Sequence, residues 1–163
     1  MTQFPNTSIE MDIDFNLEQF TAYQFAVVAN RMSQSIAVLF EQEFQIQIPD
    51  WRILIALLDR EFMTFKEVVE STSMDKSRVS RAYKRLESIN LIEVTEGPFD
   101  KRQVVMRLTL DGRQMCYDII PKAQERNDSL LETLTETERT ELDAILKKLL
   151  LRTRNIISNT DID

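Results

Sequence analysis

The feature that most restricts the fold is a change of hydrophobic period after residue 88. Up to that point apolar residues recur every three or four positions, the spacing of helices with one buried face. Two short runs rich in β-branched residues follow, at residues 91–95 and 104–108, and a turn-rich connection containing Gly97 and Pro98 separates them. This pattern predicts a β-hairpin directly after a helix. The chain is therefore expected to be mostly α-helical with one small sheet, an α+β fold.

Three helices are predicted within the forty residues before the hairpin. Ile48-Pro49-Asp50-Trp51 resembles a helix start, because proline suits the first helical position and an acidic side chain suits the positive helix end. This helix ends near Arg60, and its expected buried stripe is Trp51, Leu54, Ile55 and Leu58. A short helix is expected over about residues 65–71, and another begins at Asp75 and ends near Ser88.

The helix that begins at Asp75 has two chemically different faces. Its apolar side carries Val79, Ala82, Tyr83 and Leu86, and its polar side carries Ser77, Arg78, Arg81, Lys84 and Arg85, with Ser80 near the boundary. Two short helices joined by a tight turn, the second with a basic face, are typical of a helix-turn-helix, and a hairpin placed directly after them is typical of a wing. The sequence therefore predicts a winged helix-turn-helix lobe over residues 49–109. A basic helix face is also compatible with a merely solvated surface.

The net charge of −7 is unevenly distributed along the chain. Residues 50–110 hold 11 Lys or Arg and 10 Asp or Glu, a net charge of +1, so the rest of the chain has a net charge of −8. Only the local patch that faces phosphates decides nucleic-acid binding, since charges beyond about 8–10 Å are screened at physiological salt. The overall acidity is therefore compatible with DNA binding.

Helices at both ends of the chain are longer and more apolar than one small domain requires. One is expected over residues 17–44, another over residues 109–131, and the last begins at a capping box formed by Thr135 and Glu138. The apolar stripe of the last helix comprises Leu142, Ile145, Leu146, Leu149 and Ile156. We expect residues 1–48 and 110–163 to form a helical dimerisation region, and hence a homodimer.

Several function classes are excluded by composition. The chain has no histidine, so a Ser-His-Asp or Cys-His nucleophile and imidazole metal sites are ruled out, and its two glycines do not suffice for a dinucleotide or P-loop fingerprint. No enzymatic activity, cofactor or metal is expected. No apolar run approaches the roughly 20 residues that span a bilayer, no signal pattern opens the chain, and Cys116 is the single cysteine. A cytoplasmic protein without membrane contact is therefore expected, with Cys116 as a small buried residue.

The order and spacing of several motifs resemble the MarR family (multiple-antibiotic-resistance regulators) over nearly the whole chain. The likeness is carried by Ile48-Pro49-Asp50-Trp51-Arg52, Met74 to Arg81, Arg85-Leu86-Glu87, Asn90-Leu91-Ile92, Asp100-Lys101-Arg102, Leu108-Thr109-Leu110-Asp111-Gly112 and Thr137-Glu138-Arg139. Asn90 stands where the family has glycine, a mild change because asparagine tolerates a left-handed backbone.

This resemblance implies a dimeric, sequence-specific transcriptional regulator that places two recognition helices in successive major grooves. Half-sites of an inverted-repeat operator would then lie about 34 Å apart, one turn of duplex DNA. Ser77, Arg78, Ser80 and Arg81 are expected at base edges, with Lys76, Lys84 and Arg85 at phosphates. Lys101 and Arg102 lie near the wing tip, and the resemblance implies that Arg102 enters the minor groove and that Asp100 orients it. For Arg85 and Arg102, a purely intramolecular ion pair is the alternative.

The resemblance also implies a cleft for a small, often aromatic and anionic, effector between the DNA-binding lobe and the dimerisation helices. The candidate ligand-binding residues are Phe25, Met32, Trp51, Arg52 and Tyr117, although each one is also compatible with a core or surface role. The expected function is a repressor released from DNA by such a ligand, an aromatic acid or its thioester. A regulator without an effector and a winged-helix protein-interaction module without DNA binding remain the alternatives.

Overall fold

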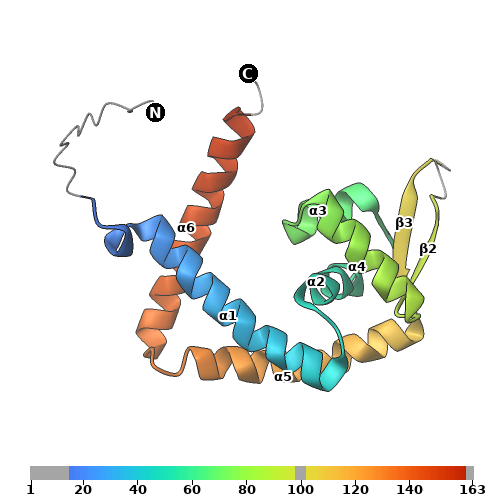
Figure 1. The fold of residues 1–163 in the computed structure, drawn as a ribbon, viewed down its shortest axis with the longest axis horizontal. Helices are drawn as coiled ribbons and strands as arrows, with labels where there is room; N and C mark the ends of the chain where they lie inside the picture. The colour runs from blue at the N-terminus through green and yellow to red at the C-terminus, as the bar shows by residue number, and fades with distance from the viewer. Residues whose placement is uncertain (1–14, 98–101, 161–163) are drawn as a thin grey trace, which may run out of the picture.

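The computed structural model of the chain describes residues 15–97 and 102–160, with the backbone alone for residues 157–160 (Figure 1). The predicted class, mostly helical with one small sheet, is confirmed. In chain order the elements are the 3-10 helix η1 (Leu17–Gln19), α1 (Thr21–Phe44), α2 (Ile48–Leu58), β1 (Met63–Thr64), α3 (Phe65–Thr72), α4 (Lys76–Ser88), β2 (Ile92–Glu96), β3 (Val104–Leu108), α5 (Leu110–Leu130) and α6 (Glu136–Thr160).

The small sheet has three antiparallel strands in the order β1-β3-β2. The hairpin β2–β3 is in the predicted place, with Val94 opposite Met106 in its middle. Strand β1 was not predicted; its two residues pair with β3 through Met63 and Thr64. A strand of two residues has no readable alternation in sequence, so only the partner strand reveals it.

N-capping side chains explain where several of the helices begin. The Asp75 carboxylate accepts a hydrogen bond from the Arg78 N–H at the start of α4 (2.8 Å), and the Thr109 hydroxyl accepts one from the Gly112 N–H at the start of α5 (2.9 Å). The predicted capping box of α6 is confirmed, since Glu138 accepts a hydrogen bond from the Thr135 N–H (2.8 Å). The hydrogen bonds from Thr135 also lower the pKa of the Glu138 carboxyl.

The first predicted helix is interrupted near its start. Phe20 has an extended backbone (φ −73°, ψ 113°), so a 3-10 turn precedes α1. The prediction of one unbroken helix from residue 17 was therefore wrong. Asn16 caps the separate turn by accepting a hydrogen bond from the Glu18 N–H (2.9 Å), and this local bond competes with helix continuation.

Helix α2 is the centre of the core, surrounded by α1, α3, α4, α5 and β3 (Figure 1). Its fully buried apolar residues are Ile53, Leu54 and Leu57. Trp51, Ile55 and Leu58, which were predicted to form the buried stripe together with Leu54, are only partly buried. A helix enclosed on several sides buries more than one face, and therefore the single-stripe prediction for α2 was incomplete.

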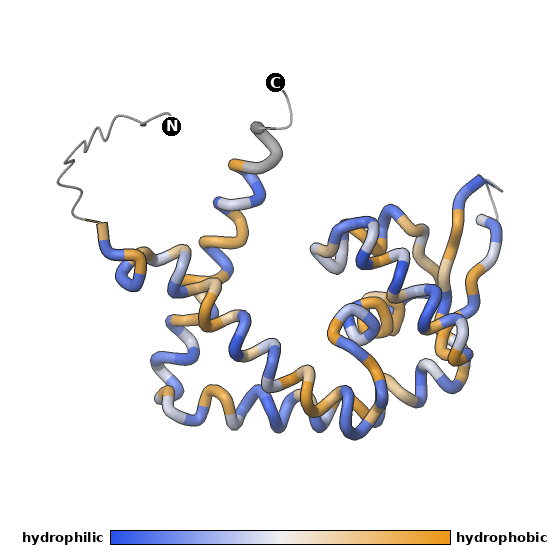
Figure 2. The backbone as a smooth tube through the Cα atoms, in the orientation of Figure 1, coloured by the Kyte–Doolittle hydropathy of each residue, from blue (hydrophilic) through white to orange (hydrophobic). Residues whose placement is uncertain are grey.

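Helices α1 and α5 contact each other near the C-terminal end of α1 and diverge away from this core, and α6 extends from the end of α5 (Figure 1). Among residues 136–156 of α6, every side chain is exposed except Arg139 and Leu142, which are half-buried. Figure 2 shows hydrophobic residues at intervals along α6 and along α1. Within the described residues, no helix is long and apolar enough to cross a lipid bilayer.

Candidate nucleic-acid interface and ligand cavities

Helix α4 presents the basic face that the sequence predicted. Its inner side is held by Val79, Ala82 and Leu86, each with no solvent exposure. On its outer side the first two turns expose Lys76, Ser77, Arg78 and Arg81, the third turn exposes Lys84, and Ser80 is half-buried. Burial of one face places the other face at the surface, so these donors are available to a partner.

The position of Arg85 differs from that of the other basic residues on α4. Its Nε donates a hydrogen bond to Oδ2 of Asp50 (2.8 Å), and its Nη2 donates one to Oδ1 (2.6 Å). Asp50 lies in α2 and is only 1% exposed. The sequence placed Arg85 at phosphates with an intramolecular ion pair as the alternative, and the structure shows that ion pair; its partner Asp50, 35 positions away, was not identified. Asp50 is the only acidic residue of α2, and this is the one signal in the sequence for such a pair.

The wing is described up to the base of its tip. The Gly97 N–H donates a hydrogen bond to the Gln103 carbonyl (2.8 Å), which closes the hairpin. Arg102 follows the tip and lines, with Phe65 and Lys66, a cavity of about 420 Å³ beside the start of α3. Asp100 and Lys101 lie outside the described residues. Further down the hairpin, Arg107 forms an ion pair with Glu93 and is thereby neutralised within the wing.

Two separate cavities contain the candidate ligand-binding residues Arg52 and Trp51. The first, called here the Arg52 cavity, has a volume of about 510 Å³ and lies between α1, the start of α2 and the start of α4; its lining includes Asn30, Arg52, Met74 and Arg78. The second has a volume of about 600 Å³ and lies between α2 and α5, with Trp51 in its lining. Trp51 also packs on the Phe40 ring (5.2 Å between ring centres).

The remaining three candidates do not join either cavity. Phe25 and Tyr117 are 39% and 55% exposed, and Met32 is half-buried on α1. None of the three is among the residues that line the two cavities. The five candidates therefore do not form one site in a single chain. On α1 the sequence predicted Phe25 and Met32, whereas the lining includes Asn30, which neither its spacing nor its chemistry marks in the sequence.

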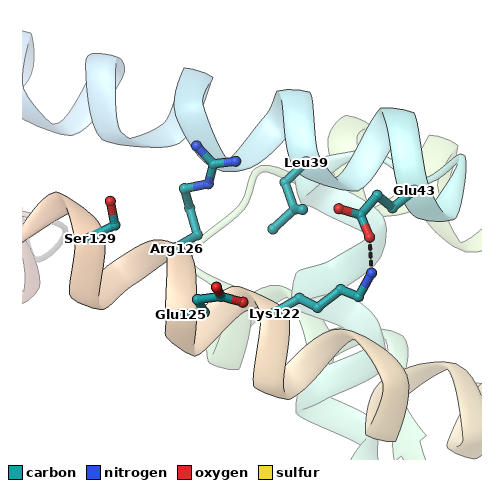
Figure 3. Close-up of a pocket in the computed structure, with 6 residues that line it drawn as sticks. All are labelled: Leu39, Glu43, Lys122, Glu125, Arg126 and Ser129. Atoms are coloured by element: carbon teal, nitrogen blue, oxygen red, sulfur yellow. Dashed lines mark hydrogen bonds and ion pairs between the residues drawn. The ribbon is translucent and has the colours of Figure 1, made fainter.

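A third cavity, of about 400 Å³, lies between α1 and α5 (Figure 3). Lys122 forms an ion pair there with Glu43 and lies over the Phe44 ring at 5.5 Å. Arg126 and Glu125 extend from α5 in the same cavity. Its two cationic and two anionic side chains balance, so the cavity offers a charged ligand no net attraction.

Cys116 is a core residue of α5 with no solvent exposure. Burial raises the pKa of its thiol to about 11. The thiol is therefore protonated at neutral pH, whereas the thiolate is the reactive form of cysteine. This agrees with the interpretation of Cys116 as a small buried hydrophobic residue.

The chain is similar to known proteins in both its sequence and its fold. Residues 44–103 match the model of the MarR family. The repressor NicR of Pseudomonas putida is 26% identical over 97 residues, 60% of this chain and 61% of NicR. The multiple antibiotic resistance protein MarR of Salmonella typhimurium is 29% identical over 106 residues, 64% of this chain and 74% of that protein. The matched segment thus spans less than two thirds of NicR. NicR is a transcriptional repressor of the helix-turn-helix type.

Solved structures share the fold over most of the chain. A MarR/EmrR family regulator from Acinetobacter sp. ADP1 superposes with a TM-score of 0.77 at 29% identity, covering 86% of this chain and 99% of that one. BpsR of Bordetella bronchiseptica, whose DNA binding is regulated by 6-hydroxynicotinic acid, superposes with a TM-score of 0.76 at 23% identity (83% and 96% covered). The C80S mutant of MarR from E. coli, complexed with operator DNA, gives a TM-score of 0.72 at 24% identity (79% and 92% covered).

Proposed function

We propose that this chain is a member of the MarR family, to whose members it is similar, and a homodimeric transcriptional regulator that binds an inverted-repeat operator and is released by a small anionic ligand. In this proposal α4 enters the major groove and the β2–β3 hairpin lies over the minor groove, as a winged helix docks on duplex DNA. In this proposal the regulator acts as a repressor, as its relative NicR does.

The observation that carries the proposal is the division of α4 into a fully buried apolar face and an exposed basic face. Arg78 and Arg81 are exposed on the first two turns, where a recognition helix meets base edges, and each fork suits the two acceptors of a guanine. Lys76 and Lys84 are exposed cations that suit phosphates. A surface that docks proteins would carry more apolar anchors than this face does, which argues against the alternative of an interaction module.

The test is binding of the purified chain to labelled DNA from upstream of its own gene, measured by fluorescence anisotropy across a salt series. Scrambled DNA of the same length is the control. We expect tight binding that prefers the upstream fragment and weakens with salt by a logarithmic slope of about −0.9 per phosphate contact. Absence of binding to either fragment at low salt would favour the protein-interaction module instead.

Dimerisation is supported by the apolar side chains that one chain leaves uncovered. Six residues of α6 are between 38% and 64% exposed: Ile145, Leu146, Leu149, Leu150, Leu151 and Ile156. Large contiguous apolar surfaces on soluble proteins mark interaction sites. A second copy of this chain offers the same surface, so a two-fold axis allows both copies to cover each other.

Replacing Leu149 with Asp is expected to convert the dimer to a monomer, because the symmetric interface would bury two uncompensated carboxylates. Light scattering coupled to size-exclusion chromatography measures the mass directly. Thr140→Asp is the matched control: it adds the same charge at an exposed position nine residues, or two and a half turns, before Leu149, on the opposite side of α6. A wild-type chain that elutes with the mass of a monomer would contradict this part of the proposal.

The Arg52 cavity supports an anionic effector. Its volume of about 510 Å³ is sufficient for a small aromatic acid. The Arg52 guanidinium is exposed and has no hydrogen-bond or ion-pair partner among the described residues, which leaves it available for a carboxylate. Arg78 of α4 lines the same cavity, so a bound acid would touch both the dimerisation helix α1 and the recognition helix.

We expect aromatic acids at millimolar concentration to raise the thermal unfolding midpoint and weaken DNA binding, with benzoate, salicylate and 6-hydroxynicotinate as the probes. In Arg52→Met the affinity for an active acid should fall at least about tenfold, because a charge-assisted hydrogen bond contributes roughly 1.5–3 kcal/mol. Arg126→Met is the control, since Arg126 lies in the cavity between α1 and α5. A larger loss in Arg126→Met than in Arg52→Met would place the ligand there instead.

A further inference from the structure

We propose that Arg85 serves DNA binding as a positioning residue rather than as a phosphate contact: its ion pair with Asp50 fixes the orientation of α4 on α2. We call this pair the α2–α4 clamp. The inference rests on the proposed DNA-binding function and concerns how the recognition helix is held for that function.

The clamp occupies the part of Arg85 that would meet a phosphate. Nε and Nη2 form one edge of the guanidinium, and both donate to the two oxygens of Asp50, at 2.8 and 2.6 Å. This two-point geometry uses the fork with which arginine binds carboxylates or phosphates. The Arg85 side chain is 34% exposed, against 63% for Arg78 on the same helix.

A second hydrogen bond, at the start of its own helix, holds the Asp50 carboxylate, so Asp50 cannot move with Arg85 toward solvent. Its Oδ2 also accepts a hydrogen bond from the Gln47 N–H (2.8 Å), at the N-terminus of α2. With 1% exposure, the carboxylate has no access to water that would replace Arg85. Turning Arg85 toward DNA would leave a buried, uncompensated charge, which is strongly unfavourable.

The apolar contacts between α2 and α4 do not by themselves define the orientation of α4. Burial of Val79, Ala82 and Leu86 is favourable but non-directional, whereas a two-point ion pair adds geometric specificity. Arg81 and Arg78 lie four and seven residues before Arg85, one and two helical turns away on the same side of α4. A change of tilt at the clamp therefore displaces the side chains expected to read bases.

The test compares Arg85→Lys and Asp50→Asn with the wild-type chain, using the anisotropy salt series on the upstream and scrambled fragments. Arg85→Lys keeps the charge but loses the fork. Asp50→Asn removes the carboxylate that holds Arg85. If the clamp positions α4, both variants lose about tenfold in affinity for the upstream fragment, the loss of roughly one base contact. Neither loses affinity for scrambled DNA, and the salt slope of both is unchanged.

Lys84→Gln is the matched control, an exposed cation next to Arg85 with no part in the clamp. It should weaken binding to both fragments equally and reduce the salt slope by about one phosphate contact. Circular dichroism checks that each variant is folded, and if Asp50→Asn is not, Arg85→Lys decides. Wild-type affinity in Arg85→Lys, or tighter binding by Asp50→Asn, would overturn the clamp. A wild-type chain that binds neither fragment would instead contradict the proposed function.

Discussion

Replacing Gly112 with Ala is expected to destabilise the protein by about 3 kcal/mol, the upper end of the range for overpacked cores. A Cβ at this position would lie 1.9 Å from the Leu91 carbonyl oxygen. That oxygen belongs to the backbone and accepts a hydrogen bond from the Thr109 N–H (3.2 Å), so the start of α5 would have to separate from the chain that enters the wing. The measurement is the free energy of unfolding from urea denaturation.

The direction of this effect is opposite to that of an ordinary helix substitution, where Ala is more favourable than Gly by about 1 kcal/mol. Gln114→Ala, at an exposed position two residues further along α5, provides the comparison and should change stability by less than about 0.5 kcal/mol. Unchanged or increased stability of Gly112→Ala would show that the close approach of α5 to Leu91 relaxes without cost.

The double variant Arg78→Ala/Arg81→Ala is expected to lose its preference for the upstream fragment over scrambled DNA, a loss of roughly 2–6 kcal/mol at 1–3 kcal/mol for each guanine contact. Both side chains are exposed, and the ion pair of Arg78 with Asp75 is a surface pair that adds little to stability. The unfolding free energy should therefore stay within about 0.5 kcal/mol of the wild-type value. Anisotropy on the two fragments measures the preference.

A loss of affinity that is equal for the upstream and scrambled fragments would show that Arg78 and Arg81 contact phosphates and that other residues read the sequence. Lys84→Ala supplies the reference for such a uniform loss. The two variants therefore test different properties. Gly112→Ala tests the stability of the fold, and the double arginine variant tests DNA recognition.

Local chemistry allowed the sequence to predict most of the secondary structure. Capping by Asp75 and by Thr135 with Glu138 depends on residues three positions apart, and the strands of the hairpin follow from β-branched runs around a turn. Asn90 adopts the expected left-handed backbone (φ 59°). The exposed basic face of α4 follows from helical spacing alone, because every third or fourth residue shares a face.

Contacts between distant segments were decided only by the tertiary structure. No spacing rule connects Asp50 with Arg85 or places Arg52 and Arg78 in one cavity, since each pair depends on how α2 packs against α4. The burial of α2 on several sides likewise reflects its neighbours and not its own pattern. The sequence by itself determined which segments become helices and strands and which helix face is basic. The packing of helices against one another decided which charges remain exposed for DNA and which are used inside the fold, because burial and ion pairing are properties of the assembled elements.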